Sequence, residues 1–237
     1  MSGGYNLTSY SNYSNYSNYS NSYSCFAAGS MVLCVDDKGG YYEKPIEQMQ
    51  IGDQVVGANG VINNVKALHN PQHGLFLCKR KLCEIEFNGK ITRFSSEHEF
   101  YVKQNNITFW GTHDIDANNE ESTVEKNGRS VIDNVYDKIC AAQGVDYYKE
   151  IGESCYDKFG DTLLEIDNNT KYFRYDGNFY KCNFRFVENV EPSYPLYQIL
   201  MDGNHSFWVN GFLVVSCQFA VPIDWYTYVK FAPIVLS

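Results

Sequence analysis

The sequence predicts a mostly β domain with a small helical insertion, and three observations lead to this prediction. Short apolar segments recur along the chain, and residues 82–87 alternate between apolar and polar side chains. Turn signals separate these segments, among them Asn59-Gly60 and Asn88-Gly89, which are typical of β-hairpins. Helical spacing of apolar residues is confined to the region between 129 and 159. Together these features favour a compact β structure over alternating strands and helices.

Strands are expected where apolar runs lie between turns that contain glycine. Residues 31–35 form such a run before Gly39-Gly40, and residues 51–56 and 90–94 are bounded in the same way. The later strands are expected at residues 171–175, 179–187, 197–200 and 206–215.

Two helices are expected in the middle of the chain. The first lies near residues 129–142, where apolar residues recur at spacings of three and four. The second is expected around residues 145–159. We interpret residues 111–171 as an insertion in the β domain.

Length and composition are those of a folded chain with an acidic surface. The 237 residues fit one large domain or two small ones, and 44% hydrophobic residues suffice for a core. The net charge of −9 repels phosphate backbones, so no nucleic-acid partner is expected. No apolar run is long enough to span a membrane, and the first 24 residues contain no Lys or Arg. We therefore expect no signal peptide and free thiols at the eight cysteines, and we favour a cytoplasmic protein while leaving its location open.

Residues 1–24 differ from the rest of the chain. A Tyr-Ser-Asn unit repeats there every three residues, a period that matches neither a helix face nor a strand face. We expect a disordered Tyr/Ser/Asn-rich tail, either a solvated leader or a tag for self-association or capture.

Four local patterns contain side chains that can do chemistry. Each places a reactive or turn-forming residue next to an apolar segment. In chain order they are Cys25-Phe-Ala-Ala-Gly-Ser-Met-Val, Ile51-Gly-Asp-Gln-Val, Ser95-Ser-Glu-His98 and His205-Ser-Phe-Trp-Val-Asn-Gly.

In this order and spacing the four patterns resemble the Hint family, the autoprocessing domain of inteins and of hedgehog C-terminal regions. The resemblance covers residues 25–110 and 172–217 and implies a compact, horseshoe-like β fold with pseudo-twofold symmetry. The implied domains are the tail, a Hint domain over residues 25–217 that is interrupted at about 111–171, and a C-terminal extension over 218–237.

The resemblance implies that the protein cuts its own chain. Cys25 would attack the peptide bond that precedes it, since its thiol can reach the Ser24 carbonyl through a five-membered ring. His98 would protonate the leaving amide nitrogen, because imidazole titrates near neutral pH. Ser95 stands where the family has threonine and would hydrogen-bond the same peptide unit. Ser is less restricted at χ1 than Thr, so weaker orientation is expected.

The C-terminal part departs from the pattern of splicing inteins. Val215 and Ser216 stand where the family has His-Asn, and serine cannot form the succinimide that cuts this junction. Gln198 stands where inteins often carry aspartate. Conventional splicing is therefore not expected. The expected outcome is cleavage before Cys25 or transfer of the acyl group, and Cys217 could accept it.

Several roles remain open at this point. His205 is either catalytic or packs under the last hairpin, and Cys217 is either a nucleophile or a small buried hydrophobe. Asp53 is expected to order a turn. The short segment after Cys217 argues against a sterol-binding unit. Two pairs could bind a metal, but neither has the usual zinc spacing: His69 with His73, and Cys78 with Cys83.

We expect a single-turnover, cysteine-dependent enzyme. It would be a monomer without a cofactor or metal. Its substrate would be its own N-terminal segment, and water or an external thiol or amine would accept the acyl group. The alternative is an inactive Hint-fold module that displays the tail to a binding partner. A structural or adhesive protein built on the repeat ranks last.

Overall fold

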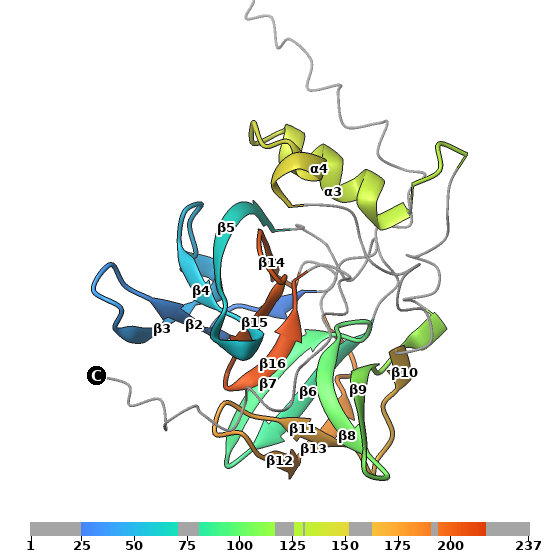
Figure 1. Ribbon diagram of the computed structural model, residues 1–237. Helices are drawn as coiled ribbons and strands as arrows, with labels where there is room; N and C mark the ends of the chain where they lie inside the picture. Colours follow the sequence, from blue (N-terminus) through green and yellow to red (C-terminus); the bar gives the residue numbers. More distant parts are fainter. Residues whose placement is uncertain are drawn as a thin grey trace, which may run out of the picture.

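The structure is a computed structural model, and it describes residues 25–70, 81–116, 126–129, 131–151, 163–190 and 194–216. The predicted mostly β architecture is confirmed, with helices α3 (Val131–Ala141) and α4 (Tyr147–Glu150) set to one side of the strands (Figure 1). The tail over residues 1–24, Cys217 and the extension over 218–237 lie outside the described residues.

The described strands are short and are connected mainly by tight turns. In the first half of the chain they are β1 (Phe26–Ala27), β2 (Met31–Val35), β3 (Tyr41–Pro45), β4 (Gln54–Val56), β5 (Ile62–His69), β6 (Leu82–Phe87), β7 (Lys90–Ser95), β8 (Phe100–Gln104) and β9 (Ile107–Thr112). In the second half they are β10 (Leu163–Glu165), β11 (Lys171–Phe173), β12 (Phe179–Lys181), β13 (Asn183–Phe186), β14 (Leu196–Met201), β15 (Ser206–Val209) and β16 (Phe212–Val215).

Most of these strands pair along one path, in the order β10-β9-β8-β16-β15-β2-β4-β5-β14-β1-β7-β6-β13. The two-residue strand β1 lies between β14 and β7, so it connects β6, β7 and β13 to the other strands. Neighbouring strands are antiparallel except for β9 and β10. The residue before β1 is therefore held at a junction between two groups of strands.

The predicted Asn-Gly turns connect antiparallel strands. Asn88 and Gly89 join β6 to β7, and both have positive φ, at 51° and 76°. A type I′ hairpin turn needs positive φ at both central positions, which Asn and Gly tolerate better than other residues. Asn59 and Gly60 lie between the paired strands β4 and β5, within a 3₁₀ turn over Ala58–Gly60. Both hairpin predictions are confirmed.

Each of the two predicted helices has a counterpart among the described residues. Helix α3 spans Val131–Ala141, and α4 spans Tyr147–Glu150, where the Asp146 carboxylate accepts a hydrogen bond from the Lys149 amide at 3.2 Å. The later part of the expected second helix lies outside the described residues. Both ends of the segment interpreted as an insertion join the sheet, because β10 pairs with β9 and the Ile166 amide donates to the Thr112 carbonyl.

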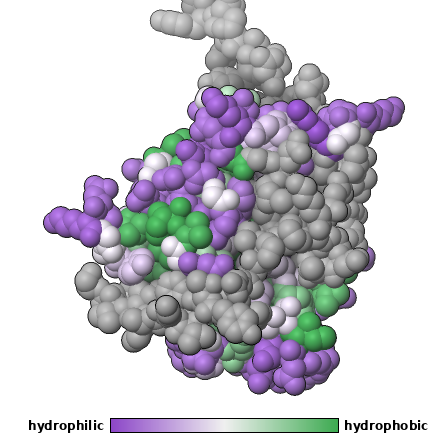
Figure 2. All heavy atoms as spheres, in the orientation of Figure 1, coloured by the Kyte–Doolittle hydropathy of each residue, from purple (hydrophilic) through white to green (hydrophobic). Residues whose placement is uncertain are grey.

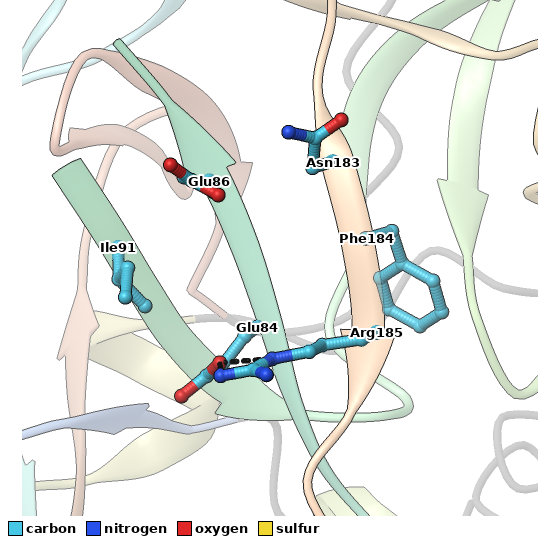
Figure 3. Close-up of a pocket in the computed structure, with 6 residues that line it drawn as sticks. All are labelled: Glu84, Glu86, Ile91, Asn183, Phe184 and Arg185. Atoms are coloured by element: carbon cyan, nitrogen blue, oxygen red, sulfur yellow. Dashed lines mark hydrogen bonds and ion pairs between the residues drawn. The ribbon is translucent and has the colours of Figure 1, made fainter. Parts of the chain in front are cut away.

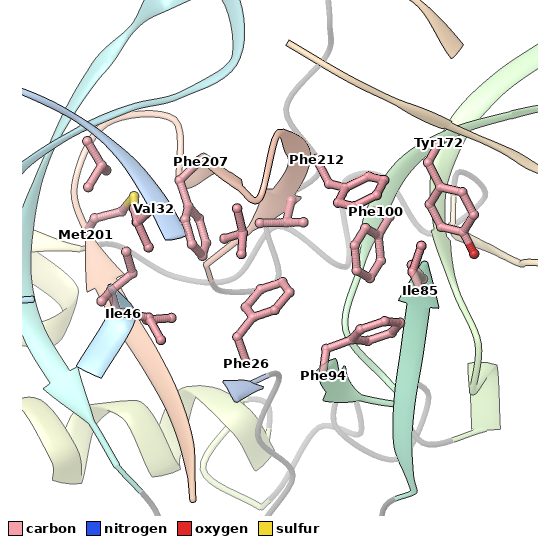
Figure 4. Close-up of a cluster of buried hydrophobic side chains, with 14 of the residues drawn as sticks. Phe26, Val32, Ile46, Ile85, Phe94, Phe100, Tyr172, Met201, Phe207 and Phe212 are labelled. Atoms are coloured by element: carbon pink, nitrogen blue, oxygen red, sulfur yellow. The ribbon is translucent and has the colours of Figure 1, made fainter. Parts of the chain in front are cut away.

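Phe26 occupies the centre of the largest core cluster. Figure 4 shows its ring directed into this cluster together with Phe94, Phe100 and Phe207. Its centroid lies 6.2 Å from the centroid of each of these three rings. Removing a buried Phe side chain typically costs about 3–5 kcal/mol. Phe26 therefore anchors β1, and the residue before it, to the core.

The surface is polar where hairpins project from the core. Asp36, Asp37 and Lys38 are exposed in the turn between β2 and β3, and this tip is hydrophilic in Figure 2, at the left. Within the described part of the chain, no helix has the length and apolar character needed to cross a membrane.

His113 follows β9 and is a buried histidine of the core. Its ring stacks on Phe184 with 3.7 Å between centroids, and its Nε2 atom lies 2.8 Å from the Tyr172 hydroxyl. Burial lowers the pKa of His113 from 6.5 to about 3. The unfolded chain therefore binds a proton that the folded chain excludes, so this part of the stability is complete above pH 6.5 and is lost as the pH falls toward 3.

We expect the variant His113→Gln to lose less stability on acidification than the wild type. Glutamine can still hydrogen-bond Tyr172 but does not titrate in this range. The free energy of unfolding in urea should depend on pH less steeply, by up to about 1.4 kcal/mol per pH unit. Equal pH slopes for the two proteins between pH 6.5 and 4 would contradict this assignment.

Candidate functional site

Cys25 lies immediately before β1, where β7 and β14 flank that strand. Phe26 pairs with Phe94 of β7 on one side and with Tyr197 of β14 on the other. Cys25 is fully buried and belongs to an apolar cluster that includes Val135 of α3. The predicted nucleophile is thus held in the interior by two strands and covered in part by the helix.

Ser95 contacts the backbone of Cys25 on both sides of its α-carbon. The amide nitrogen of Cys25 donates to Ser95 Oγ at 2.8 Å, and this nitrogen is the leaving group of the predicted cleavage. The Cys25 carbonyl accepts from the Ser95 amide at 3.0 Å, and Ser95 Oγ lies 3.3 Å from the same oxygen. The hydroxyl is therefore in position to orient the peptide unit before Cys25.

His98 lies in the same group of residues. Its amide donates to the Ser95 carbonyl at 3.0 Å, which closes a tight turn over the Ser95-x-x-His98 motif. Its ring, 1% exposed, packs edge-on against Phe26 with 4.1 Å between centroids. The residue next to Cys25 thus fixes the imidazole, and Cys25, Ser95 and His98 form one cluster.

The segment after β9 holds the loop that carries Ser95 and His98. The Ser96 carbonyl accepts from the Thr112 hydroxyl at 3.2 Å and from the His113 amide at 3.2 Å. The Ser96 hydroxyl donates to the Asp114 carboxylate at 3.1 Å. These bonds fix the loop from outside the motif. The sequence analysis did not identify this support, because the two segments are brought together only by pairing of β8 with β9.

His205 and the end of β16 form a second group close to the first. The Ser216 amide donates to the His205 carbonyl at 2.6 Å. His205 is buried with φ at 56°, and burial lowers its pKa from 6.5 to about 4. A histidine that is neutral at pH 7 can accept a proton but is a weak source of one. Its catalytic role remains a prediction.

Gln198 connects the two groups. Phe26 pairs with Tyr197 and Ala27 with Leu196, so the same register places Gln198 opposite Cys25. The side-chain Nε2 of Gln198 donates a short hydrogen bond to the Ser216 carbonyl. The position that differs from inteins therefore contributes a donor at the C-terminal end of the domain.

Tyr136 of α3 is a site residue that the sequence analysis missed. Its hydroxyl donates to Gln198 Oε1 at 3.1 Å and lies 2.8 Å from Gln198 Nε2. A signal was present, since Tyr136 lies four residues after Ile132 and four before Cys140 on the apolar face of the helix. A tyrosine on a buried face normally needs a partner for its hydroxyl.

Two motif residues have structural roles. The Asp53 carboxylate accepts from the Lys44 ammonium at 2.7 Å and from the Gln50 amide at 2.7 Å, so it orders a turn as predicted. The Asn210 side chain accepts from the Met31 amide at 2.9 Å and donates to the Thr92 hydroxyl at 2.9 Å. Asn210 thus ties the last hairpin to β2 and β7.

The other described cysteines are buried or partly buried as free thiols. Burial raises the thiol pKa of Cys34, Cys140 and Cys182 to about 12, and it raises that of Cys83 further still. These four thiols stay protonated near neutral pH and are poor nucleophiles.

No group of three or more side chains of the metal-binding types gathers among the residues that the structure describes. His73 and Cys78, from the two candidate metal pairs, lie outside the described residues.

A shallow pocket lies away from this site, on the outer face of β6, β7 and β13. Figure 3 shows Glu84 in it, bound to Arg185. Glu84 also accepts from Arg93 at 2.6 Å, so the carboxylate is already engaged by two guanidinium groups. The pocket contains none of the predicted site residues, and its ion pairs hold three strands together.

Comparisons with protein-family models and with curated proteins find no match. Among solved structures the chain is similar to an intein-like domain from Clostridium thermocellum, at 14% identity and a TM-score of 0.43, over 81% of this chain and 98% of that one. It is similar to the gp41-1 intein at 15% identity and a TM-score of 0.42, over 81% and 98%. It is similar to a DnaB intein from Synechocystis sp. PCC 6803 at 9% identity and a TM-score of 0.47, over 82% and 99%.

Proposed function

We propose that the protein is a self-processing Hint domain in which Cys25 attacks the Ser24–Cys25 peptide bond. One observation carries the proposal: the hydrogen bond from the Cys25 amide to Ser95 Oγ, at 2.8 Å. The hydroxyl of Ser95 accepts a hydrogen bond from the nitrogen of the bond to be cut, and the buried His98 follows one turn later in the same loop, which supports an acyl shift at this bond.

The reaction is an N-to-S acyl shift. The Cys25 sulfur forms a bond to the carbonyl carbon of Ser24, and the thiol proton passes to His98. The bond from that carbon to the Cys25 nitrogen breaks, and the nitrogen takes up a proton from His98. The products are a thioester that carries residues 1–24 and a free amino group on Cys25.

The acyl group then passes to water, an external thiol or an external amine, or to Cys217. Release to water ends with a carboxylate on Ser24 and a regenerated thiol on Cys25. Conventional splicing is not part of the proposal, because Ser216 cannot cyclise as asparagine does. The domain acts once, on its own chain, and needs no cofactor.

The alternative is an inactive Hint-fold module that presents its tail to a partner. The observation that favours it is the complete burial of Cys25 among apolar side chains. Such surroundings disfavour the thiolate that attacks the carbonyl. The mass of the purified protein distinguishes the two functions, since only the enzyme loses residues 1–24.

We expect Cys25→Ala to abolish cleavage between Ser24 and Cys25. No other side chain is tethered at a five-membered-ring distance from that carbonyl. Intact-mass measurement of freshly expressed protein should show the full chain in the variant and the shortened chain in the wild type. Continued loss of residues 1–24 from the variant, in the absence of a protease, would refute the mechanism.

We expect dithiothreitol or hydroxylamine to accelerate release of the tail. Both attack a thioester far more readily than an amide, so they drain the small equilibrium population of the thioester. The rate, followed by mass spectrometry, should increase with the concentration of either reagent. A rate independent of both reagents would mean that no thioester forms.

We expect His98→Ala to impair cleavage more severely than His205→Ala. His98 packs on Phe26, the residue that follows Cys25, whereas His205 contacts the end of β16 through its backbone. Loss of general acid assistance typically costs about 10²–10⁴-fold in rate. Thiol-induced release by the His205 variant should remain close to that of the wild type. Equal losses in two folded variants would show that this division of roles is wrong.

A further inference from the structure

Three hairpins meet around Arg174, the residue that follows β11. Arg174 forms a bridge with Phe212 at the start of β16, and the amide of Tyr175 donates to the Gly211 carbonyl at 3.2 Å. The hairpin of β6 and β7 adds Phe87, whose ring lies against the Arg174 guanidinium. Arg174 therefore lies where three separate turns converge, and none of these residues takes part in the proposed cleavage.

Two aromatic rings hold the guanidinium group of Arg174. Its Cζ atom lies 4.3 Å from the centroid of Phe87 and 4.5 Å from that of Phe212. Gly211 allows this packing, because a Cβ atom at that position would lie 2.5 Å from an Nη atom of Arg174. Arginine stacks readily on aromatic faces, and two such faces restrict the orientation of its N–H donors. The guanidinium is thus preorganised by its neighbours.

The charge of Arg174 is not paired with any carboxylate among the residues that the structure describes. Arg93 and Arg185 differ in this respect, since both pair with Glu84. Arg174 is only partly exposed, and burial lowers the pKa of its guanidinium. An arginine nevertheless stays protonated at neutral pH. The protein therefore keeps a partly desolvated cation in place without an acidic partner from the described chain.

The acidic residue closest in sequence, Asp176, is engaged within its own hairpin. One oxygen of its carboxylate accepts a hydrogen bond from the Asn178 amide at 3.0 Å. The other oxygen accepts from the Tyr180 hydroxyl at 2.7 Å. These bonds direct the carboxylate to β12 and its turn, and the donors of Arg174 remain available to a ligand.

A cavity of about 350 Å³ opens beside the guanidinium. Its charged groups are Arg174, Lys90 and Asp176, and the side chains of Phe87 and Tyr175 supply aromatic walls. Sites for small molecules have similar volumes and combine apolar walls with a few polar groups. Two cations and one carboxylate leave a single positive charge, which matches a monoanion. A dianion would be repelled more strongly by Asp176.

We propose that Arg174 and Lys90 bind the carboxylate of a small aromatic acid, with the ring of the ligand against Phe87 and Tyr175. The planar fork of Arg174 matches the two oxygens of a carboxylate, and Lys90 adds a second positive charge. This site goes beyond the proposed self-cleavage and does not depend on it, since it needs neither Cys25 nor the tail.

The test uses the full chain with ¹⁵N-labelled arginine. Benzoate is the probe, benzamide has the same ring without the charge, and phenyl phosphate carries a second negative charge at pH 7.5. Arg174→Lys keeps the positive charge but loses the fork. Arg129→Lys is the matched control, because Arg129 also stacks on a ring, with 3.9 Å from its Cζ to the centroid of Tyr148, but pairs with Asp137 at 3.8 Å.

Two measurements follow binding. By NMR, we expect benzoate to shift the Nε–Hε signal of Arg174 until it saturates, and benzamide to leave this signal unmoved. By calorimetry, Arg174→Lys should bind benzoate about tenfold more weakly or worse, because it loses charge-assisted hydrogen bonds. Lys90→Gln should weaken binding by less, about two- to fivefold, since Lys90 is exposed and solvent screens its charge. Arg129→Lys should bind as the wild type does.

The titration of the wild type decides the proposal even where Arg174→Lys does not fold. An Arg174 signal that does not move with benzoate, or that moves without saturating, overturns the site. Equal shifts with benzamide overturn the recognition of a carboxylate, and tighter binding of phenyl phosphate overturns the preference for a monoanion. Equal affinity of Arg174→Lys and wild type for benzoate overturns the role of the arginine fork.

Discussion

The burial of Phe26 is the constraint on which the candidate site depends. Cys25 begins the described chain and has no strand of its own to fix it, but the next side chain is locked among three other phenylalanine rings. Burial of a side chain of this size stabilises the fold by about 1.5–3 kcal/mol relative to exposure. The same ring supports His98 at 4.1 Å. One apolar residue thus adjoins Cys25 in the chain and supports the ring of His98.

Strand β1 places a neighbouring strand on each side of the chain at Cys25. Ser95 occupies one side, and Gln198 lies in register on the other. The two flanking strands come from opposite halves of the sequence, and each is bonded or connected to further segments of the site. Ser95 brings the loop with His98, and Gln198 brings the end of β16 and helix α3. The site is therefore a meeting point of four chain segments around a two-residue strand.

This arrangement gives a physical reason for an amide, rather than a carboxylate, at position 198. A carboxylate can only accept hydrogen bonds, whereas a carboxamide also donates. At position 198 the donor satisfies the buried carbonyl of Ser216, and the acceptor is satisfied by Tyr136. A buried carbonyl without a donor would cost about 1–3 kcal/mol. The departure from the family pattern is thus accompanied by Tyr136 on α3, which bonds the carboxamide oxygen of Gln198 while the carboxamide nitrogen bonds the Ser216 carbonyl.

The sequence by itself determined the strand-rich class, the Asn-Gly hairpins and the helix near residue 135, and it singled out Cys25, Ser95 and His98 as candidate site residues. These features are local: a turn, an alternation or a four-residue motif is complete within a few positions. Only the tertiary structure decided that Gln198 lies opposite Cys25, that Tyr136 bonds Gln198, and that Thr112 and Asp114 hold the loop of His98. Each of these contacts joins residues at least 16 positions apart. Strand register and helix packing create such contacts, and both depend on how the whole core is filled rather than on any local pattern.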